Sequence, residues 1–146
     1  MPTLKEYHKP TEVSAALALL QRKSLPTVLL AGGTWLTPRL GKEVQAGAVV
    51  DLSGLGLDGI ERDPDTLRLG PMATLAEVTR DDTCRSLASG ILARTAKRDA
   101  TVNVRNAATV GGTVVVAPAD SEFILALLAL AAELAVRSNG ITSLSL

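Results

Sequence analysis

The amino-acid sequence predicts an α+β fold made of two lobes. Two continuous apolar runs, residues 27–31 and 48–52, follow an amphipathic segment, which is typical of buried strands in a small parallel β-α-β lobe. Beyond residue 58, short apolar segments joined by a tight turn indicate an antiparallel hairpin, and amphipathic helices follow it. We therefore place a boundary near residues 53–58, between a first lobe at 1–55 and a mixed second lobe at 56–146.

The first lobe should contain one helix and two strands. Thr11 is a suitable N-cap for a helix that ends near residues 23–24, before Pro26. Its apolar residues recur on one face: Val13, Ala16, Leu17 and Leu20. The strand at 27–31 leads into Gly32 and Gly33 at its carboxyl end, where ligands bind in α/β sheets.

The second lobe should begin with a hairpin and continue with helices. Residues 59–62 and 67–69 are expected to pair around a turn at 63–65. Thr74 and Glu77 form a capping box ahead of a short helix, and residues 87–98 predict a longer amphipathic helix.

The end of the chain should hold a second glycine loop, one helix and a hairpin. Residues 101–104 lead into the loop, and residues 114–116 after it are strand-like. Asp120 or Ser121 should cap the most apolar helix, 123–133, which we expect to be buried on nearly all sides. Residues 134–137 and 141–144 should pair around the Asn139-Gly140 turn.

Composition excludes several classes of function. Fifteen basic and fifteen acidic residues cancel, and only one Phe, one Trp and one Tyr are present, so nucleic-acid binding is not expected. Cys84 is the only cysteine and His8 the only histidine, which argues against a disulfide framework, a metal site and a Ser-His-Asp triad. The N-terminus lacks a signal-peptide pattern and no apolar run is long enough to span a bilayer, so we expect a cytoplasmic protein without membrane contact.

The most informative motif is Gly-Gly-Thr, which occurs at residues 32–34 and again at 111–113. Paired glycines leave no Cβ between backbone and ligand, and they allow successive N–H groups to converge on an anion. Two such loops would suit the diphosphate of one dinucleotide. The alternative is that each pair is simply a tight turn after a strand.

Two other glycine patterns do not qualify as nucleotide motifs. Residues 54–59 match G-x-G-x-x-G, but a strand and a turn follow them where the Rossmann fingerprint requires a helix. Gly41 and Lys42 resemble the end of a P-loop, but no Ser or Thr follows the lysine.

Six segments occur in an order that is similar to one known family. They are residues 10–20, Leu-Ala-Gly-Gly-Thr at 30–34, Val-Asp-Leu-Ser at 50–53, residues 69–75, residues 104–112, and residues 126–133. Together they resemble the FAD-binding subunit of the molybdenum hydroxylases, a family that includes the flavin module of xanthine dehydrogenase and the medium subunit of carbon monoxide dehydrogenase. The resemblance implies a two-lobed FAD-binding domain of the vanillyl-alcohol-oxidase (PCMH) type, incomplete at its C-terminus, with FAD extended between the lobes.

The resemblance also implies which residues hold FAD. The first loop would contribute Ala31, Gly32, Gly33, Thr34, Trp35 and Leu36; the second would contribute Thr109, Val110, Gly111, Gly112 and Thr113. Glu122 stands where the family commonly has a nucleotide-binding Asp, and Asn103 and Arg105 would orient the second loop or contact the flavin. Trp35 departs from the family pattern, and its indole would either line or obstruct the cleft. No catalytic residue and no metal ligand is expected.

The implied function is that of a flavin module in a multi-subunit molybdenum-dependent dehydrogenase. It would take electrons from an iron–sulfur subunit, beside a molybdopterin subunit, and pass them to NAD, a quinone or oxygen. Family members continue beyond the position of Leu146, so we expect a truncated chain that forms a homo-oligomer in isolation. The alternatives are a remnant or assembly piece that binds no flavin, and a module that binds only ADP or NAD.

Overall fold

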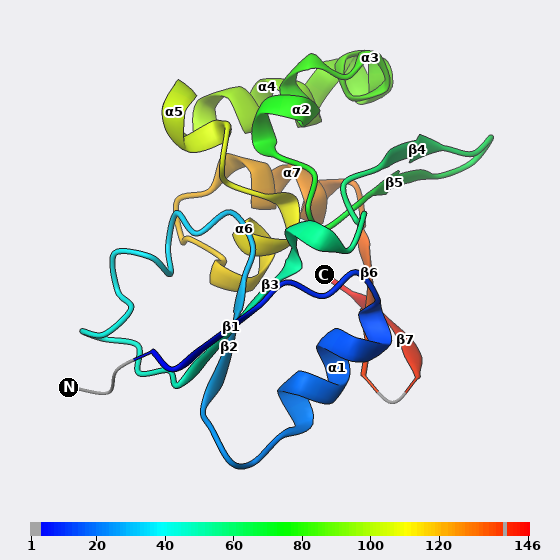
Figure 1. Ribbon diagram of the computed structural model, residues 1–146. Coiled ribbons are helices and arrows are strands. Elements are labelled where there is room, and N and C mark those ends of the chain that lie inside the picture. The colour runs from blue at the N-terminus through cyan, green and yellow to red at the C-terminus, as the bar shows by residue number, and fades with distance from the viewer. Residues whose placement is uncertain (1–3, 139) are drawn as a thin grey trace.

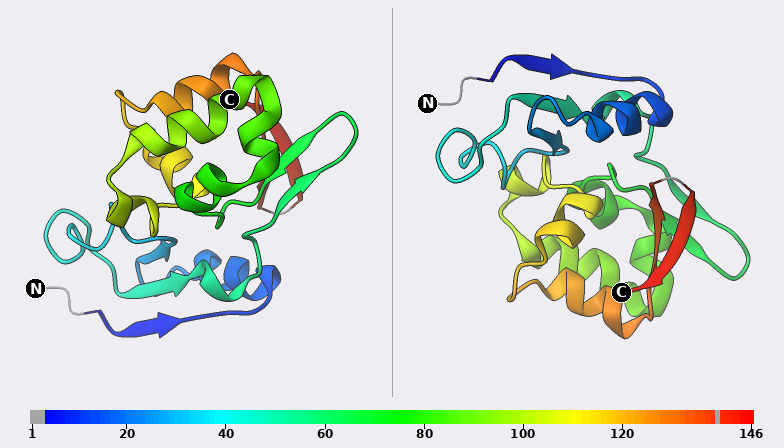
Figure 2. Two further views of the ribbon diagram at one scale, coloured as in Figure 1. Left: turned by 90° about the horizontal axis from the view of Figure 1, so that it is seen from above. Right: turned by 90° about the horizontal axis from the view of Figure 1, so that it is seen from below.

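The computed structural model describes residues 4–138 and 140–146. The first part of the chain forms a layer of strands with one helix, and the helices of the second part lie on the other side of a connecting segment (Figures 1 and 2). The chain passes between the two through a short 3-10 helix, η1 (Leu52–Gly54).

The first lobe is a parallel sheet of three strands in the order β1-β3-β2. The central strand β3 (Ala48–Asp51) is buried along its whole length, as expected for the middle of a parallel sheet. β2 (Thr27–Leu30) is the edge strand that lies nearer the second lobe (Figure 2). β1 (Glu6–His8) was not predicted from the sequence; it pairs with β3 from Glu6↔Ala48 to His8↔Val50.

Helix α1 (Val13–Gln21) joins β1 to β2. The expectation that Thr11 caps it is wrong, because the N-cap is Glu12 and no side chain bonds the first turn. The cap of η1, in contrast, is well built. Asp51 accepts a hydrogen bond from the backbone N–H of Ser53 (2.8 Å) and another from the hydroxyl of Tyr7, so this carboxylate ties the end of β3 to β1.

The first elements of the second lobe are those that the sequence predicts. β4 (Ile60–Arg62) and β5 (Leu67–Leu69) form an antiparallel hairpin, with Ile60 opposite Leu69. α2 (Leu75–Arg80) begins with the predicted capping box, in which Thr74 and Glu77 each bond the other's backbone N–H group.

The predicted helix at 87–98 is shorter than expected. α3 (Asp82–Ser86) and a 3-10 turn, η2 (Leu87–Gly90), come first, and α4 covers Ile91–Asp99. Ala88, Ser89 and Gly90 all have left-handed backbone angles (φ 47°, 57° and 72°), so the chain cannot continue an α-helix through them.

Residues 102–116 contain two helices, and the second covers the segment where a strand was expected. α5 (Val102–Arg105) precedes α6 (Val110–Val116). The N-cap of α6 is Thr109, whose hydroxyl accepts a hydrogen bond from the N–H of Gly112 (3.1 Å). The prediction of a strand at 114–116 is therefore wrong. The side-chain cap and the surrounding packing outweigh the strand preference of three consecutive valines.

α7 (Glu122–Ala129) is capped by Ser121, one of the two predicted caps, and ends earlier than residue 133. Ala131 adopts a left-handed conformation, and the N–H of Ala132 bonds back to Leu127 O (3.0 Å), which closes the helix as a Schellman turn does. β6 (Glu133–Arg137) and β7 (Ile141–Ser145) then form the expected hairpin, although Asn139 lies outside the described residues.

The core of the second lobe gathers where α2, α4 and α7 meet. Phe123, Leu75, Val78 and Cys84 are almost fully inaccessible to solvent. The expectation that α7 is buried on nearly all sides is wrong, since Leu125 is 60% and Leu128 47% exposed. One face of α7 packs on the core and the opposite face is apolar surface. None of the helices in the described ranges is long and apolar enough to cross a membrane.

Candidate functional site

A cavity of about 820 Å³ lies between the lobes, and its walls are mainly apolar. It brings together most of the residues that the two glycine motifs predicted. The predicted residues that line it are Ala31, Gly32, Gly33, Thr34, Trp35, Leu36, Thr109, Gly111, Gly112 and Thr113.

The first glycine loop supplies unsatisfied backbone donors to this cavity. Within the described residues, none of the backbone N–H groups from Gly32 to Leu36 has a hydrogen-bond acceptor, and every one of these residues lines the cavity. Gly33 has a φ of +72°, in the left-handed region. Successive N–H groups around such a residue form a concavity that binds anions.

The second glycine pair does not form the loop that we predicted. Gly111 and Gly112 lie in the first turn of α6, and the N–H groups of this turn are already bonded within the protein. Val110 N–H donates to Ala73 O (2.8 Å), Gly111 N–H to Pro71 O (2.9 Å), and Gly112 N–H to the Thr109 hydroxyl. The hypothesis of two facing anion sites is therefore corrected to one, at the first loop.

The glycines of the second pair serve close packing instead. A Cβ built on Gly111 would lie 2.9 Å from Pro71 O, and one built on Gly112 would lie 2.9 Å from the Thr109 hydroxyl. Gly32 of the first loop does the same across the lobes, since its Cβ would lie 1.7 Å from Ala107 O. The absence of a side chain at Gly32 thus lets the first loop lie directly against the segment that leads into α6.

Trp35 lines the cavity and is 42% exposed. The guanidinium carbon of Arg39 lies 4.7 Å from the centre of its indole ring, within the range of a cation–π contact. The Nη1 of Arg39 also donates to the Trp35 carbonyl (2.9 Å), and its Nε pairs with Glu43 at 3.2 Å. Arg39 itself lines the cavity.

Two charged residues of the lining, Arg39 and Asp99, were not predicted from the sequence. Asp99 accepts hydrogen bonds from the Ser121 hydroxyl (2.8 Å) and from Phe123 N–H (3.0 Å), and so fastens the start of α7 to the end of α4. A charged residue near the end of an amphipathic helix looks like solvated surface, and only tertiary structure reveals such a role.

The remaining predicted residues lie outside the cavity. Val110 is buried in the core, and Glu122 pairs with Arg98 at 3.3 Å on the surface, with its side chain 48% exposed. Arg105 donates to the carbonyl oxygens of Lys97 (2.7 Å) and Ala100 (2.6 Å), which favours its orienting role over a flavin contact.

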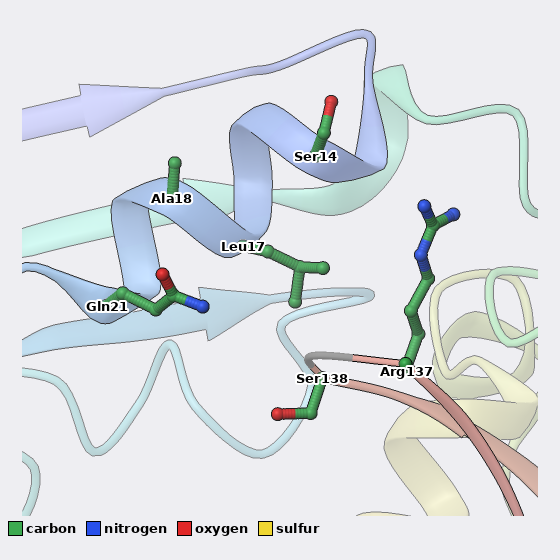
Figure 3. A pocket seen from close by; sticks show the side chains of 7 residues that line it. Ser14, Leu17, Ala18, Gln21, Arg137 and Ser138 are labelled. Atoms are coloured by element: carbon green, nitrogen blue, oxygen red, sulfur yellow. The ribbon is translucent and has the colours of Figure 1, made fainter.

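A second hollow of about 440 Å³ lies between α1 and the β6–β7 hairpin. Figure 3 shows Leu17 and Gln21 of α1 on one side, with Arg137 and Ser138 of the hairpin on the other. It shares no lining residue with the cavity between the lobes. In the described part of the chain, no cluster of three or more His, Cys, Asp or Glu side chains could hold a metal ion.

Comparison with known proteins identifies the fold. Residues 3–145 match the model of a family described as the FAD binding domain in molybdopterin dehydrogenase. This chain belongs to that family. The cofactor of this family is FAD. This agrees with the family that the six sequence segments resemble.

Several FAD-binding domain relatives are known by name. The chain is 29% identical over 140 residues to caffeine dehydrogenase subunit beta of Pseudomonas sp. (strain CBB1), a match that covers 94% of this chain and 47% of that protein. It is 31% identical over 116 residues to the carbon monoxide dehydrogenase medium chain of Hydrogenophaga pseudoflava, covering 78% of this chain and 40% of the relative.

Solved structures agree with this assignment. The carbon monoxide dehydrogenase structure from Hydrogenophaga pseudoflava superposes with a TM-score of 0.91 at 27% identity, and quinoline 2-oxidoreductase from Pseudomonas putida 86 with a TM-score of 0.91 at 26% identity. Each match covers 99% of this chain and 51% of the other. The chain thus spans about half the length of the relatives it matches.

The residues present suit the diphosphate of FAD. The cavity volume falls within the range of about 300–1,000 Å³ that is usual for ligand pockets. The unbonded backbone N–H groups from Gly32 to Leu36 provide donors for phosphate oxygens, and the left-handed conformation of Gly33 lets the loop turn around them.

Proposed function

We propose that this chain binds FAD in the cavity between its lobes, with the diphosphate held by the first glycine loop. The observation that carries the proposal is the run of backbone N–H groups from Gly32 to Leu36, which line the cavity and have no acceptor among the described residues. Successive backbone N–H groups that lie around one concavity without an acceptor in the protein are suited to an anionic ligand.

FAD, when bound, supplies the redox chemistry that the protein side chains lack. The chain's own task is to bind, orient and shield. Gly33 lets the loop turn around the phosphates, and apolar residues such as Leu29 and Val116 exclude water from the walls of the cavity. Thr113 stands on the opposite wall, where its hydroxyl bonds Thr109 O (2.9 Å) within α6.

We further propose the context in which this module acts. The names of its relatives describe subunits of caffeine and carbon monoxide dehydrogenases, which favours a flavin-dependent oxidoreductase subunit. Iron–sulfur and molybdopterin subunits would be its partners, with electrons passing from the iron–sulfur partner through FAD to NAD, a quinone or oxygen. Four expectations stay predictions. They are membership in a xanthine dehydrogenase-type enzyme, a homo-oligomer of the isolated chain, a cytoplasmic location, and the boundary between lobes at residue 55.

The test is titration of the purified chain with FAD and with ADP. Gly33→Ala should weaken the binding of both ligands at least tenfold, because its methyl group would lie 2.7 Å from the Thr37 hydroxyl at a residue with positive φ, so the loop that carries the N–H groups must shift. Gly41→Ala is the matched control: Gly41 has a φ of +80° and open space around it, but does not line the cavity. The backbone strain in Gly41→Ala should be comparable to that in Gly33→Ala, and its affinity for FAD and ADP should equal that of the wild type.

The outcomes separate the alternatives. Binding of FAD and ADP that only Gly33→Ala weakens supports the proposal. Binding of ADP without FAD would instead favour a module for the ADP moiety alone. A folded wild-type chain that binds neither nucleotide would contradict the proposal and favour a non-catalytic remnant.

A further inference from the structure

The two charged residues of the cavity lining differ in how far the protein already satisfies their hydrogen bonds. Among the described lining residues, the charged side chains are Arg39 and Asp99. Both carboxylate oxygens of Asp99 already accept bonds from the start of α7. Arg39 therefore contributes the positive charge that a ligand in the cavity can meet.

The guanidinium of Arg39 is held in place before any ligand binds. It lies over the indole of Trp35 (4.7 Å), its Nη1 bonds the Trp35 carbonyl, and its Nε faces Glu43 at 3.2 Å. A guanidinium carries five N–H donors. These contacts engage Nε and Nη1, and within the described ranges Nη2 has no acceptor.

We propose that Arg39, stacked on Trp35, is the residue that recognises the diphosphate charge of the dinucleotide, and that Glu43 limits the strength of this contact. The proposal rests on the proposed function, because it names a side-chain determinant of the same site. An arginine fixed by stacking presents a planar fork that suits phosphate oxygens and loses little freedom on binding.

Glu43 makes the proposal specific. Its carboxylate is four residues beyond Arg39 and 71% exposed, so it partly neutralises the cation without being buried. If Arg39 acts by charge, removal of Arg39 and removal of Glu43 must change anion affinity in opposite directions. If Arg39 only braces the loop through the Trp35 carbonyl, both removals loosen the same brace and both weaken binding.

The experiment uses the intrinsic fluorescence of Trp35, the only tryptophan in the chain, to follow titration with ADP and with adenosine. Arg39→Gln should weaken ADP binding about tenfold, as expected for loss of a charge-assisted hydrogen bond. Glu43→Gln should strengthen ADP binding about two- to fivefold. The affinity for adenosine, which lacks phosphates, should be changed by neither substitution.

Arg68→Gln is the matched control, because Arg68 also forms an ion pair with an acidic residue, Asp63 (3.1 Å), but lies on β5 outside the cavity lining. It should leave ADP affinity unchanged. A FAD titration by flavin absorbance should reproduce the order Glu43→Gln, wild type, Arg39→Gln.

The outcomes keep this inference separate from the proposed function. If wild type binds ADP and FAD but Arg39→Gln has no effect, or if both variants weaken binding, the inference is overturned while FAD binding stands. If the wild type binds nucleotide and the Gly33→Ala variant binds it equally well, the proposed site itself is misplaced. Absence of any nucleotide binding by the wild type overturns both.

Discussion

The α-carbon of Gly32 faces the carbonyl oxygen of Ala107 so closely that a methyl group on it would lie 1.7 Å from that oxygen. The atom in the way is backbone, so no side-chain rotation can relieve the overlap. Gly32→Ala should therefore lower the free energy of unfolding by more than about 2 kcal/mol. Urea denaturation followed by circular dichroism measures this loss.

A suitable control for Gly32→Ala is Gly59→Ala. A methyl group on Gly59 would meet only the side chain of Glu61, at an ordinary 3.4 Å. This substitution should change the free energy of unfolding by no more than about 0.5 kcal/mol. Equal stability of the two variants would mean that the lobes do not approach one another at Gly32.

Acid should weaken the link between Tyr7 and Asp51. Burial acts to raise the pKa of Asp51, but the hydrogen bonds from Tyr7 and Ser53 outweigh it, so the pKa lies below its usual value. A lowered pKa stabilises the fold above the unfolded-state value of about 3.9 and loses this contribution as the pH falls through the folded-state value. Tyr7→Phe should therefore destabilise the chain at pH 7 and differ less from wild type below about pH 4.

The measurement for Tyr7→Phe is urea denaturation from pH 7 down to pH 3. The same substitution in an Asp51→Asn background is the control, because there the carboxylate is absent at every pH. A Tyr7→Phe effect that persists unchanged in that background would show that the tyrosine acts through packing alone.

Cys84 should be chemically inert in the folded chain. Its side chain is fully buried, and burial together with the neighbouring Asp81 raises the pKa of the thiol to about 12. Only the thiolate reacts quickly with disulfide reagents. The rate of reaction with such a reagent at pH 8 should follow unfolding and rise steeply with urea, and rapid reaction of the native protein would contradict the buried placement.

Glu122→Gln separates a helix role from a ligand role. Glu122 lies in the first turn of α7, pairs with Arg98, and does not line the cavity. We expect the substitution to lower stability by about 0.3–1 kcal/mol through the helix dipole, while FAD and ADP affinities stay within twofold of wild type. A selective loss of affinity would restore the role that family resemblance implies.

The sequence predicts elements well where the signal is local. The capping box of Thr74 and Glu77 and the hairpin of β4 and β5 are specified within a few residues, and both are confirmed. It fails where tertiary contacts decide. β1 is a strand only because β3 pairs with it, and Val114–Val116 are helical because Thr109 caps a turn that packs against Pro71 and Ala73.

The candidate site shows the same division. The two Gly-Gly-Thr motifs both line one cavity, as predicted, although the first offers unpaired N–H groups and the second allows close packing. The motif alone cannot show that the N–H groups near Gly111 are bonded to Pro71 and Ala73, whereas those that follow Gly32 are left unpaired. Arg39 was missed because an arginine beyond a loop carries no pattern that distinguishes it from ordinary surface charge.

The β6–β7 hairpin pairs only with itself among the strands that the structure describes. A two-stranded ribbon is marginally stable in water, and Val136 and Leu144 on this one are 42% and 49% exposed. Local opening of this ribbon should therefore need less free energy than global unfolding, and its amide protons should exchange before those of β3. Arg137 and Ser138 would leave α1 when the ribbon opens, so we expect the hollow in Figure 3 to exist only while the hairpin is closed.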